Sequence, residues 1–372
     1  MYKLGIVGIG HWFGRLHEGM KSIGGLEIAS ALGTRPYEAK RELLARFGID
    51  KNMYYTITED GLIPGAFFKG IDAVHISDPN SEHAHQAIEA FENGKKAIVE
   101  KSFAVDKGEF DSFVDYVKST GQENNVYLHL HYMHKLPVIE LKKRIADLTK
   151  KYGRVTGING TFFESANAED ANRGWLFSPR NGGLFMDWIH PFEVIYTSMP
   201  TSFGKLNELG LFAVNKEYSN EYPTGIYASM GVSGKHFVPG AQCTVRICKG
   251  AEPKWARKSI RFMFESGNYV LLNFDGSEKE FSAGSRGGFE MGVADGQRFN
   301  TETSVPLKGE NTSEIFVREI LSLCAGKNPG LGISDIEEIF RPQWDYQSMA
   351  ETVELVKDVR AIRRFLDSGM KS

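Results

Sequence analysis

The stretch AVHISDPNSEHAHQAIEAFENGKKAIVEKSF, residues 73–103, decides the fold. Its first apolar run predicts a strand, which Asp-Pro-Asn ends, and a helix with an apolar stripe then runs to Gly94. A second apolar strand leads into Glu100-Lys101. Because ligands lie outside the carboxyl ends of parallel strands, Lys101 is predicted to point into the crevice where chemistry would occur.

The same alternation of strands and helices continues on both sides of this stretch. The further predicted elements are strands over residues 3–8, 27–32 and 126–131 and helices over residues 37–47 and 106–118. Repeated βα units of this kind predict a doubly wound parallel sheet.

The segment GIVGIGHWFG joins the first predicted strand to the first helix. Gly8 would permit the tight turn, and Gly10 would let backbone amides approach a pyrophosphate at the helix N-terminus. Trp12 and Phe13 are predicted to lie against the same cofactor. The spacing departs from GxGxxG, since Phe13 holds the third glycine position and Gly14 comes one residue late. An ordinary turn is the alternative, but the flanking strand and helix favour dinucleotide binding.

The second strand ends in Gly-Thr-Arg-Pro and has no acidic residue for a ribose 2′-hydroxyl. Thr34 followed by Arg35 suits a 2′-phosphate, because arginine can bind it through two parallel hydrogen bonds. This pattern favours NADP, with NAD possible, and a surface arginine in a loop is the alternative. The other residues predicted to bind the cofactor are Pro79, Asn80, His83, Glu100 and Lys101. For His83, a solvated helix residue is the alternative.

Composition excludes several classes of function. Charged residues make up 24% of the 372 residues and the net charge is −3, so no nucleic-acid partner is indicated. No apolar run approaches the roughly 18 residues of a membrane span. Three cysteines without a CxxC pair favour the cytoplasm and no structural metal. His129, His131 and His134 also lack metal-ligand spacing, so hydrogen-bonded histidines near a cleft are the favoured interpretation.

In the second half of the chain, GGLFMDWIHPFE at residues 182–193 is the most informative segment. Pro191 has no amide hydrogen, so it belongs in the first turn of a helix that begins around residues 187–190. Asp187 and His190 then cluster at the helix start, and Glu193 shares a face with His190. Other expectations are a loop with Arg173, Trp175 and Arg180, several strands after residue 211, a loop over residues 278–303, and helices over residues 311–323 and 344–366.

Three motifs together resemble the Gfo/Idh/MocA oxidoreductase family: GIVGIGHWFG, DPNSEHAHQAIEAFENGKKAIVEKS and GGLFMDWIHPFE. The resemblance implies an α/β chain with a Rossmann domain at residues 1–131. An α+β domain with a large, mostly antiparallel open sheet would follow at residues 132–372 and would bind substrate. It also implies hydride transfer between nicotinamide C4 and a hydroxyl or carbonyl of a sugar, cyclitol or derivative. A homodimer or homotetramer through the C-terminal sheet is expected.

The resemblance assigns catalysis to Lys101, His190 and Asp187. His190 would take the hydroxyl proton, Lys101 would stabilise the oxygen, and Asp187 would orient His190 or bind a neighbouring hydroxyl. The sequence departs from the family pattern in three places here: Ser102 replaces the proline of Glu-Lys-Pro, Asp187 stands three residues before His190 instead of four, and Glu193 replaces the aspartate three residues after the histidine. An NAD-dependent glycoside hydrolase of the same fold and a non-catalytic NADP-binding regulator are the alternatives.

Overall fold

A computed structural model describes residues 1–165, 187–199, 203–204, 206–213, 230–251, 255–274, 286–295, 298–308, 312–327, 331–350 and 352–370. Its contacts divide the chain into two compact units. The first unit contains residues 1–131 and 310–336, and the second contains residues 132–309 and 337–372. No helix in the described ranges is both long and apolar enough to cross a bilayer.

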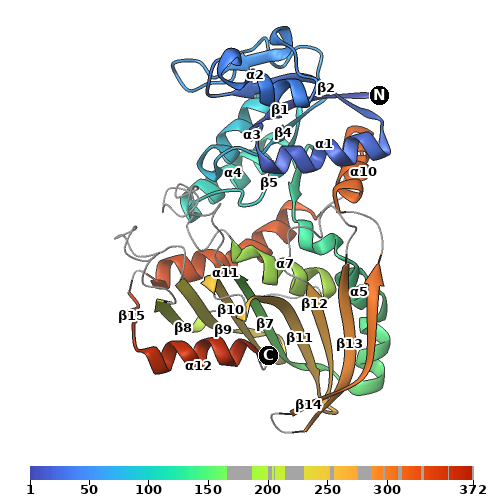
Figure 1. Cartoon of the computed structure of the whole chain (residues 1–372), viewed down its shortest axis with the longest axis vertical. Coiled ribbons are helices and arrows are strands. Elements are labelled where there is room, and N and C mark those ends of the chain that lie inside the picture. The colour runs from blue at the N-terminus through green and yellow to red at the C-terminus, as the bar shows by residue number, and fades with distance from the viewer. Residues whose placement is uncertain are drawn as a thin grey trace. The chain divides into compact units, whose positions relative to one another are not determined.

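The first unit is built on a six-stranded parallel sheet with strand order β3-β2-β1-β4-β5-β6. Its strands are β1 (Tyr2–Val7), β2 (Leu26–Gly33), β3 (Tyr54–Thr56), β4 (Ala73–Ile76), β5 (Lys96–Glu100) and β6 (Val126–His129). This order reverses direction at β1 and β4 and is that of a dinucleotide-binding Rossmann fold. The predicted doubly wound sheet is therefore confirmed (Figure 1).

Helices connect and cover these strands. They are α1 (His11–Ile23), α2 (Tyr37–Arg46), α3 (His83–Glu92), α4 (Lys107–Thr120) and α10 (Thr312–Cys324). The sequence sets their ends clearly at α4, where the Asp106 carboxylate accepts a hydrogen bond from the amide of Glu109 and Gly121 adopts the left-handed conformation. Such ends fix where the following strand begins.

Helix α10 packs beside α1 in the core of the first unit, although it lies almost 200 residues after the other elements (Figure 1). Phe316, Val317 and Ile320 are buried in the same cluster as Leu4 and Ile6 of β1. A single boundary at residue 131 therefore does not describe the chain, because residues 310–336 complete the first unit. The apolar face of α10 packs in the core of the first unit, and the sequence of α10 alone could not reveal this position.

The second unit is built on a nine-stranded sheet with order β14-β13-β12-β11-β7-β10-β9-β8-β15. Its strands are β7 (Val155–Ser165), β8 (Leu206–Ala213), β9 (Met230–Val238), β10 (Ala241–Ala251), β11 (Arg257–Phe264), β12 (Asn268–Phe274), β13 (Arg286–Asp295), β14 (Arg298–Lys308) and β15 (Leu355–Val356). Among the described pairs, β10–β7 and β15–β8 are parallel and the others are antiparallel. The expected large, mostly antiparallel sheet is confirmed.

Helices cover this sheet on both faces (Figure 1). They are α5 (Leu136–Tyr152), α7 (Ile189–Ser198), α11 (Ile333–Ala350) and α12 (Val359–Met370). Consecutive residues of β7 point to opposite faces: the Phe162 ring contacts Tyr132, whereas the Phe163 ring contacts Phe365 of α12. A Cβ on Gly160 would meet Pro191 of α7, so α7 lies on the Phe162 face.

Two expectations for the C-terminal half were wrong. Within the predicted loop over residues 278–303, β13 and β14 pair as a hairpin, and Gly292 lies so close to the backbone of Asn300 that a Cβ would clash. Glycine there is a packing requirement of the ladder. The predicted helix over residues 344–366 is two helices, because α11 ends at Ala350 and Asp358 caps a new helix by accepting from Ala361. The predicted loop with Arg173, Trp175 and Arg180 lies outside the described residues.

Candidate active site

The turn between β1 and α1 has a geometry that favours glycine. Gly8 has φ of +85°, and a Cβ there would lie 2.5 Å from the backbone nitrogen of Asp78. A Cβ on Gly10 would meet no described atom within 4 Å, and no described side chain caps the start of α1. The turn therefore leaves room beside the N-terminus of α1. These residues fit the pyrophosphate of a dinucleotide.

We expect Gly8→Ala to weaken folding and cofactor binding, with Gly14→Ala as the matched control. The new Cβ must push against the backbone that follows β4, and the positive φ adds about 1–3 kcal/mol of strain. In contrast, a Cβ on Gly14, within α1, would first meet Phe47 at 3.9 Å, so alanine there should be neutral or stabilising. Urea unfolding with and without NADP measures both effects. Equal behaviour of the two variants would contradict the role of Gly8.

Phe13 is a core residue. It is 0% exposed, and its ring packs edge-on against Phe47 with centroids 4.8 Å apart. Its assignment to the cofactor is therefore not supported, because the aromatic side chain is fully used in packing α1 against the sheet. The side chain of Trp12 lies outside the described residues. The third glycine position of GxGxxG is thus occupied by Phe13, a buried core residue in the first turn of α1.

Thr34 and Arg35 follow β2 directly and are exposed. The Tyr54 hydroxyl of β3 donates a 2.6 Å hydrogen bond to the carbonyl of Arg35, which fixes the backbone there. Burial lowers the pKa of Lys40 on α2, and the neighbouring charge of Arg35 lowers it further. The chain that follows β2 therefore carries two cations, Arg35 directly after the strand and Lys40 in the first turns of α2. Sequence reasoning missed Lys40, since a lysine in the first turns of a surface helix carries no signal of its own.

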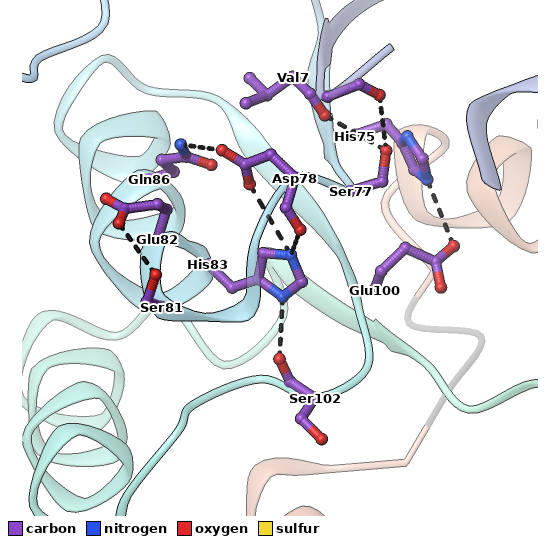
Figure 2. A network of polar contacts seen from close by, with 11 residues as sticks. Val7, His75, Ser77, Asp78, Ser81, Glu82, His83, Gln86, Glu100 and Ser102 are labelled. Atoms are coloured by element: carbon purple, nitrogen blue, oxygen red, sulfur yellow. Dashed lines mark hydrogen bonds and ion pairs between the residues drawn. The ribbon is translucent and has the colours of Figure 1, made fainter. Parts of the chain in front are cut away.

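Among the residues that follow β4, His83 is 1% exposed and its ring lies between two backbone carbonyls (Figure 2). One ring nitrogen bonds the carbonyl of Asp78 and the other that of Ser102, each at 2.9 Å. Pro79 and Asn80 lead into α3 through a short 3-10 turn, and Asn80 is buried. The His83 ring is thus engaged inside the protein, whereas the sequence suggested a contact with the cofactor.

Glu100, at the end of β5, is buried and lies between two histidines. His129 Nδ1 donates to its Oε1 at 2.8 Å, and His75 Nε2 lies 3.5 Å from the same oxygen. Burial alone would raise the pKa of Glu100, but the charge and hydrogen bond of His129, helped by His75, hold it well below its usual range. The ring of Phe316 stacks on His129 with centroids 3.5 Å apart. The carboxylate is therefore held charged in an interior network.

Lys101 follows β5 directly and is partly exposed. The peptide bond between Lys101 and Ser102 is cis. Gly8, Asp78 and Lys101 come after β1, β4 and β5, which are neighbours in the sheet, so all three lie at its carboxyl edge. This is the edge at which doubly wound sheets bind their ligands.

In the second unit, Asp187 and His190 lie at the start of α7, as predicted, and both are buried. His190 Nε2 is 3.7 Å from Asp187 Oδ1, and His190 Nδ1 is 3.5 Å from Glu193 Oε1. The backbone amide of Tyr132 donates a 2.6 Å hydrogen bond to Glu193, and the Tyr132 ring lies 4.6 Å from the imidazole. The histidine is thus flanked by two carboxylates despite the shortened spacing to Asp187.

Three charged residues beside this histidine were missed by sequence reasoning. Lys249 of β10 forms an ion pair with Asp187 and lies 3.4 Å from Glu164 of β7, which also pairs with Lys258 of β11. Although burial would raise it, Lys258 and Lys249 lower the pKa of Glu164 to about 2. Burial also raises the pKa of Tyr132 to about 12. A lysine within an apolar strand was the sequence signal for both Lys249 and Lys258. The two residues come from different strands, however, and approach the same carboxylate only in the folded sheet.

Comparison with known proteins agrees with this geometry. A sequence model described as "Oxidoreductase family, NAD-binding Rossmann fold" matches residues 2–128. An uncharacterized oxidoreductase of Rhizobium meliloti is 35% identical over 105 residues, 28% of this chain and 29% of that protein. scyllo-Inositol 2-dehydrogenase (NAD⁺) of Bacillus subtilis is 31% identical over 164 residues, 43% of each chain. The chain thus matches less than half the length of these curated relatives.

Solved structures resemble the fold over almost the whole chain. KijD10 of Actinomadura kijaniata, a 3-ketoreductase crystallised with NADP and TDP-benzene, has a TM-score of 0.74 and 13% identity, covering 96% of this chain and 99% of KijD10. myo-Inositol 2-dehydrogenase of Lactobacillus plantarum has a TM-score of 0.69 and 16% identity, covering 94% and 97%. At these identities the likeness establishes the two-part fold.

Proposed function

Because residues 2–128 match the sequence model of the Gfo/Idh/MocA family of NAD-binding oxidoreductases, we propose that the chain is an NAD(P)-dependent dehydrogenase or reductase. It would act on a CH–OH or carbonyl group of a sugar, cyclitol or derivative. The supporting observation is the position of Lys101 at the carboxyl edge of the matched Rossmann sheet, next in line after Gly8 and Asp78. The inositol dehydrogenase and the ketoreductase among its relatives support the substrate class.

The residues that would hold the dinucleotide are the glycine turn at Gly8 and Gly10, the cationic end of β2, and the chain after β4 at Pro79 and Asn80. When bound, the nicotinamide would accept or donate the hydride. The Lys101 ammonium would donate a hydrogen bond to the reacting oxygen and stabilise negative charge as it develops there. His190 would remove the hydroxyl proton during oxidation and return it during reduction.

Asp187 supports His190 in this proposal. Its carboxylate lies 3.7 Å from Nε2 of the imidazole and is itself paired with Lys249. A carboxylate held in this way can orient the ring and stabilise the imidazolium that forms when the proton is taken. Because Lys249 also approaches Glu164, removal of Lys249 would leave the buried Asp187 carboxylate and the partly exposed Glu164 carboxylate with less compensation.

We propose NADP as the preferred cofactor, because Arg35 and Lys40 lie together where an adenosine 2′-phosphate would be recognised. Arg35→Ala is expected to raise the dissociation constant of NADP by about tenfold or more and to leave that of NAD nearly unchanged. The matched control is Arg46→Ala, which removes an exposed arginine from the last turn of α2. Fluorescence titration with both cofactors measures the effect. Equal losses for NAD and NADP would contradict recognition of the phosphate.

A paired NAD and NADP binding measurement, followed by a screen of sugars, cyclitols and sugar acids at the nicotinamide absorbance band, tests the function. Turnover with a net change in that absorbance supports the proposal. Product release without a net change would instead identify a glycoside hydrolase that uses the cofactor transiently. Tight NADP binding without turnover on the whole panel would identify a regulator.

We also propose a homodimer or homotetramer formed through the nine-stranded sheet, on the basis of the family resemblance. Sedimentation equilibrium would measure the assembly, and a monomer at micromolar concentration would contradict it.

The cytoplasm is the proposed compartment. Support comes from Cys243, Cys248 and Cys324, which are all free thiols.

A further inference from the structure

The His83 ring occupies an unusual position within the first unit. Nδ1 lies 2.9 Å from the carbonyl oxygen of Ser102, and Nε2 lies 2.9 Å from the carbonyl oxygen of Asp78. Figure 2 shows the ring between these two segments. With 1% of the residue exposed, solvent does not compete for either nitrogen.

These two contacts determine which hydrogens the ring carries. Carbonyl oxygens can only accept hydrogen bonds, and a neutral imidazole has a single N–H. Both contacts are hydrogen bonds only if both nitrogens carry hydrogen, so the ring that satisfies them is the imidazolium. Asp78 Oδ1 lies 3.8 Å from Nε2; burial raises the pKa of this carboxyl, and the charge of His83 lowers it. Other titratable groups near the ring include the adjacent Glu82 and the buried His75 of β4; burial lowers the pKa of His75, and the charge of His83 acts in the same direction.

The two carbonyls belong to the two segments on which the proposed chemistry depends. Asp78 follows β4, and its backbone nitrogen lies against the glycine turn at Gly8. Ser102 follows Lys101 directly after β5. A hydrogen bond from Gln86 to the Asp78 carboxylate, 2.6 Å long, and one from the Ser77 hydroxyl to the Gly8 carbonyl, 2.8 Å long, hold the first segment in place. The His83 side chain thus joins this segment to the residue after Lys101.

We propose that His83 is a positioning residue: its ring, with a hydrogen on each nitrogen, ties the chain after Lys101 to the chain that supports the glycine turn. The ring thereby sets the distance between the lysine and the bound dinucleotide. The inference rests on the proposed function, because the consequence for turnover requires Lys101 to be catalytic. The protonation of the ring and its hold on residues 101–102 can be measured without turnover.

The first test observes the ring itself in the full-length protein. Nitrogen-15 NMR of histidine-labelled protein at neutral pH should contain two slowly exchanging ring N–H correlations that both disappear in His83→Gln. Because glutamine donates from one nitrogen and presents an oxygen to the other carbonyl, it removes one of the two bonds and nearly preserves the volume. Loss of only one N–H correlation in the variant would show a neutral ring and would overturn the proposal.

The second test compares His83→Gln with His85→Gln, which changes a histidine of the same helix whose side chain is 53% exposed and pairs with Glu89. Hydrogen–deuterium exchange of peptides that contain residues 101–106 should accelerate in His83→Gln and stay unchanged in His85→Gln. In His83→Gln, kcat should fall at least about tenfold, with little change in KM for the polyol, because a displaced catalytic group slows the chemical step.

The outcomes separate the two proposals. If wild-type protein has no turnover on the substrate panel, the proposed function fails, and NMR and hydrogen exchange still decide the role of His83. If wild-type protein turns over and His83→Gln keeps both its kcat and its exchange rate, the positioning role is wrong while the function stands. Weaker polyol binding in His83→Gln, seen as a higher KM with an unchanged kcat, would also overturn the positioning role.

Discussion

Replacing Lys101 with methionine is expected to lower kcat by at least about 10²-fold. Methionine keeps the length and apolar stem of the side chain but removes the ammonium group that would hydrogen-bond the reacting oxygen. Because that bond strengthens as negative charge develops, its loss should affect kcat more than KM. Steady-state rates on the best substrate of the polyol panel, together with NADP affinity by fluorescence, measure both quantities.

Lys107→Met is the control for this experiment. Lys107 lies on α4, is exposed, and pairs with Asp111 on the surface, so its loss removes the same charge at a place without a proposed role. Its kcat should remain close to that of the wild type. If Lys101→Met kept near-normal turnover, or if the two variants lost activity equally, the assignment of Lys101 to the chemical step would be wrong.

Replacing His190 should have an effect of similar size. His190→Gln is expected to lower kcat by at least about 10²-fold, because the amide can hydrogen-bond but cannot accept a proton at neutral pH. His190→Ala should lose as much activity and also some stability, since the buried imidazole lies 4.6 Å from the Tyr132 ring and between two carboxylates. The pH profile of kcat/KM should lose the limb that reports the base.

Two variants are needed because a buried histidine can also matter for folding. Circular dichroism and thermal unfolding identify a variant that fails to fold, and His190→Gln should stay folded since it preserves polarity and most of the volume. A folded His190→Gln protein with normal turnover and an unchanged pH profile would exclude His190 as the base. If the folded Lys101→Met and His190→Gln proteins both kept normal turnover, the proposed mechanism would be wrong.

The sequence predicted most of the first sheet because five of its six strands carried a local signal, whereas β3 was not among the predicted strands. The apolar run at residues 73–76 and the Gly94 stop are local features, and repeated βα units indicate a doubly wound parallel sheet. Helix α10 was predicted as a helix, but its place was not, because packing against α1 depends on apolar residues over 200 positions away. The β13–β14 hairpin was missed because its glycines serve a close backbone approach that only the paired strand reveals.

At the candidate site, sequence motifs identified the residues next to strand and helix ends. Lys101 and Gly8 lie at the sheet edge as expected, and Asp187 and His190 meet at the start of α7. The residues that support them were hidden, because Lys249 and Glu164 come from separate strands that are neighbours only in the folded sheet. The sequence motif marked His83, but its contact with the backbone carbonyl of Ser102 could not be read from the sequence.

The late position of α10 constrains how this protein can be synthesised. A ribosome that has produced the first 131 residues has made every strand of the parallel sheet, but Phe316, Val317, Ile320 and Leu323 are still missing from its core. Until they emerge, the nascent sheet exposes the apolar surface on which they will pack, and the second unit is translated in the meantime. The first unit should therefore reach its final compactness only after residues 310–336 have been translated, and a fragment cut at residue 131 should be prone to aggregation.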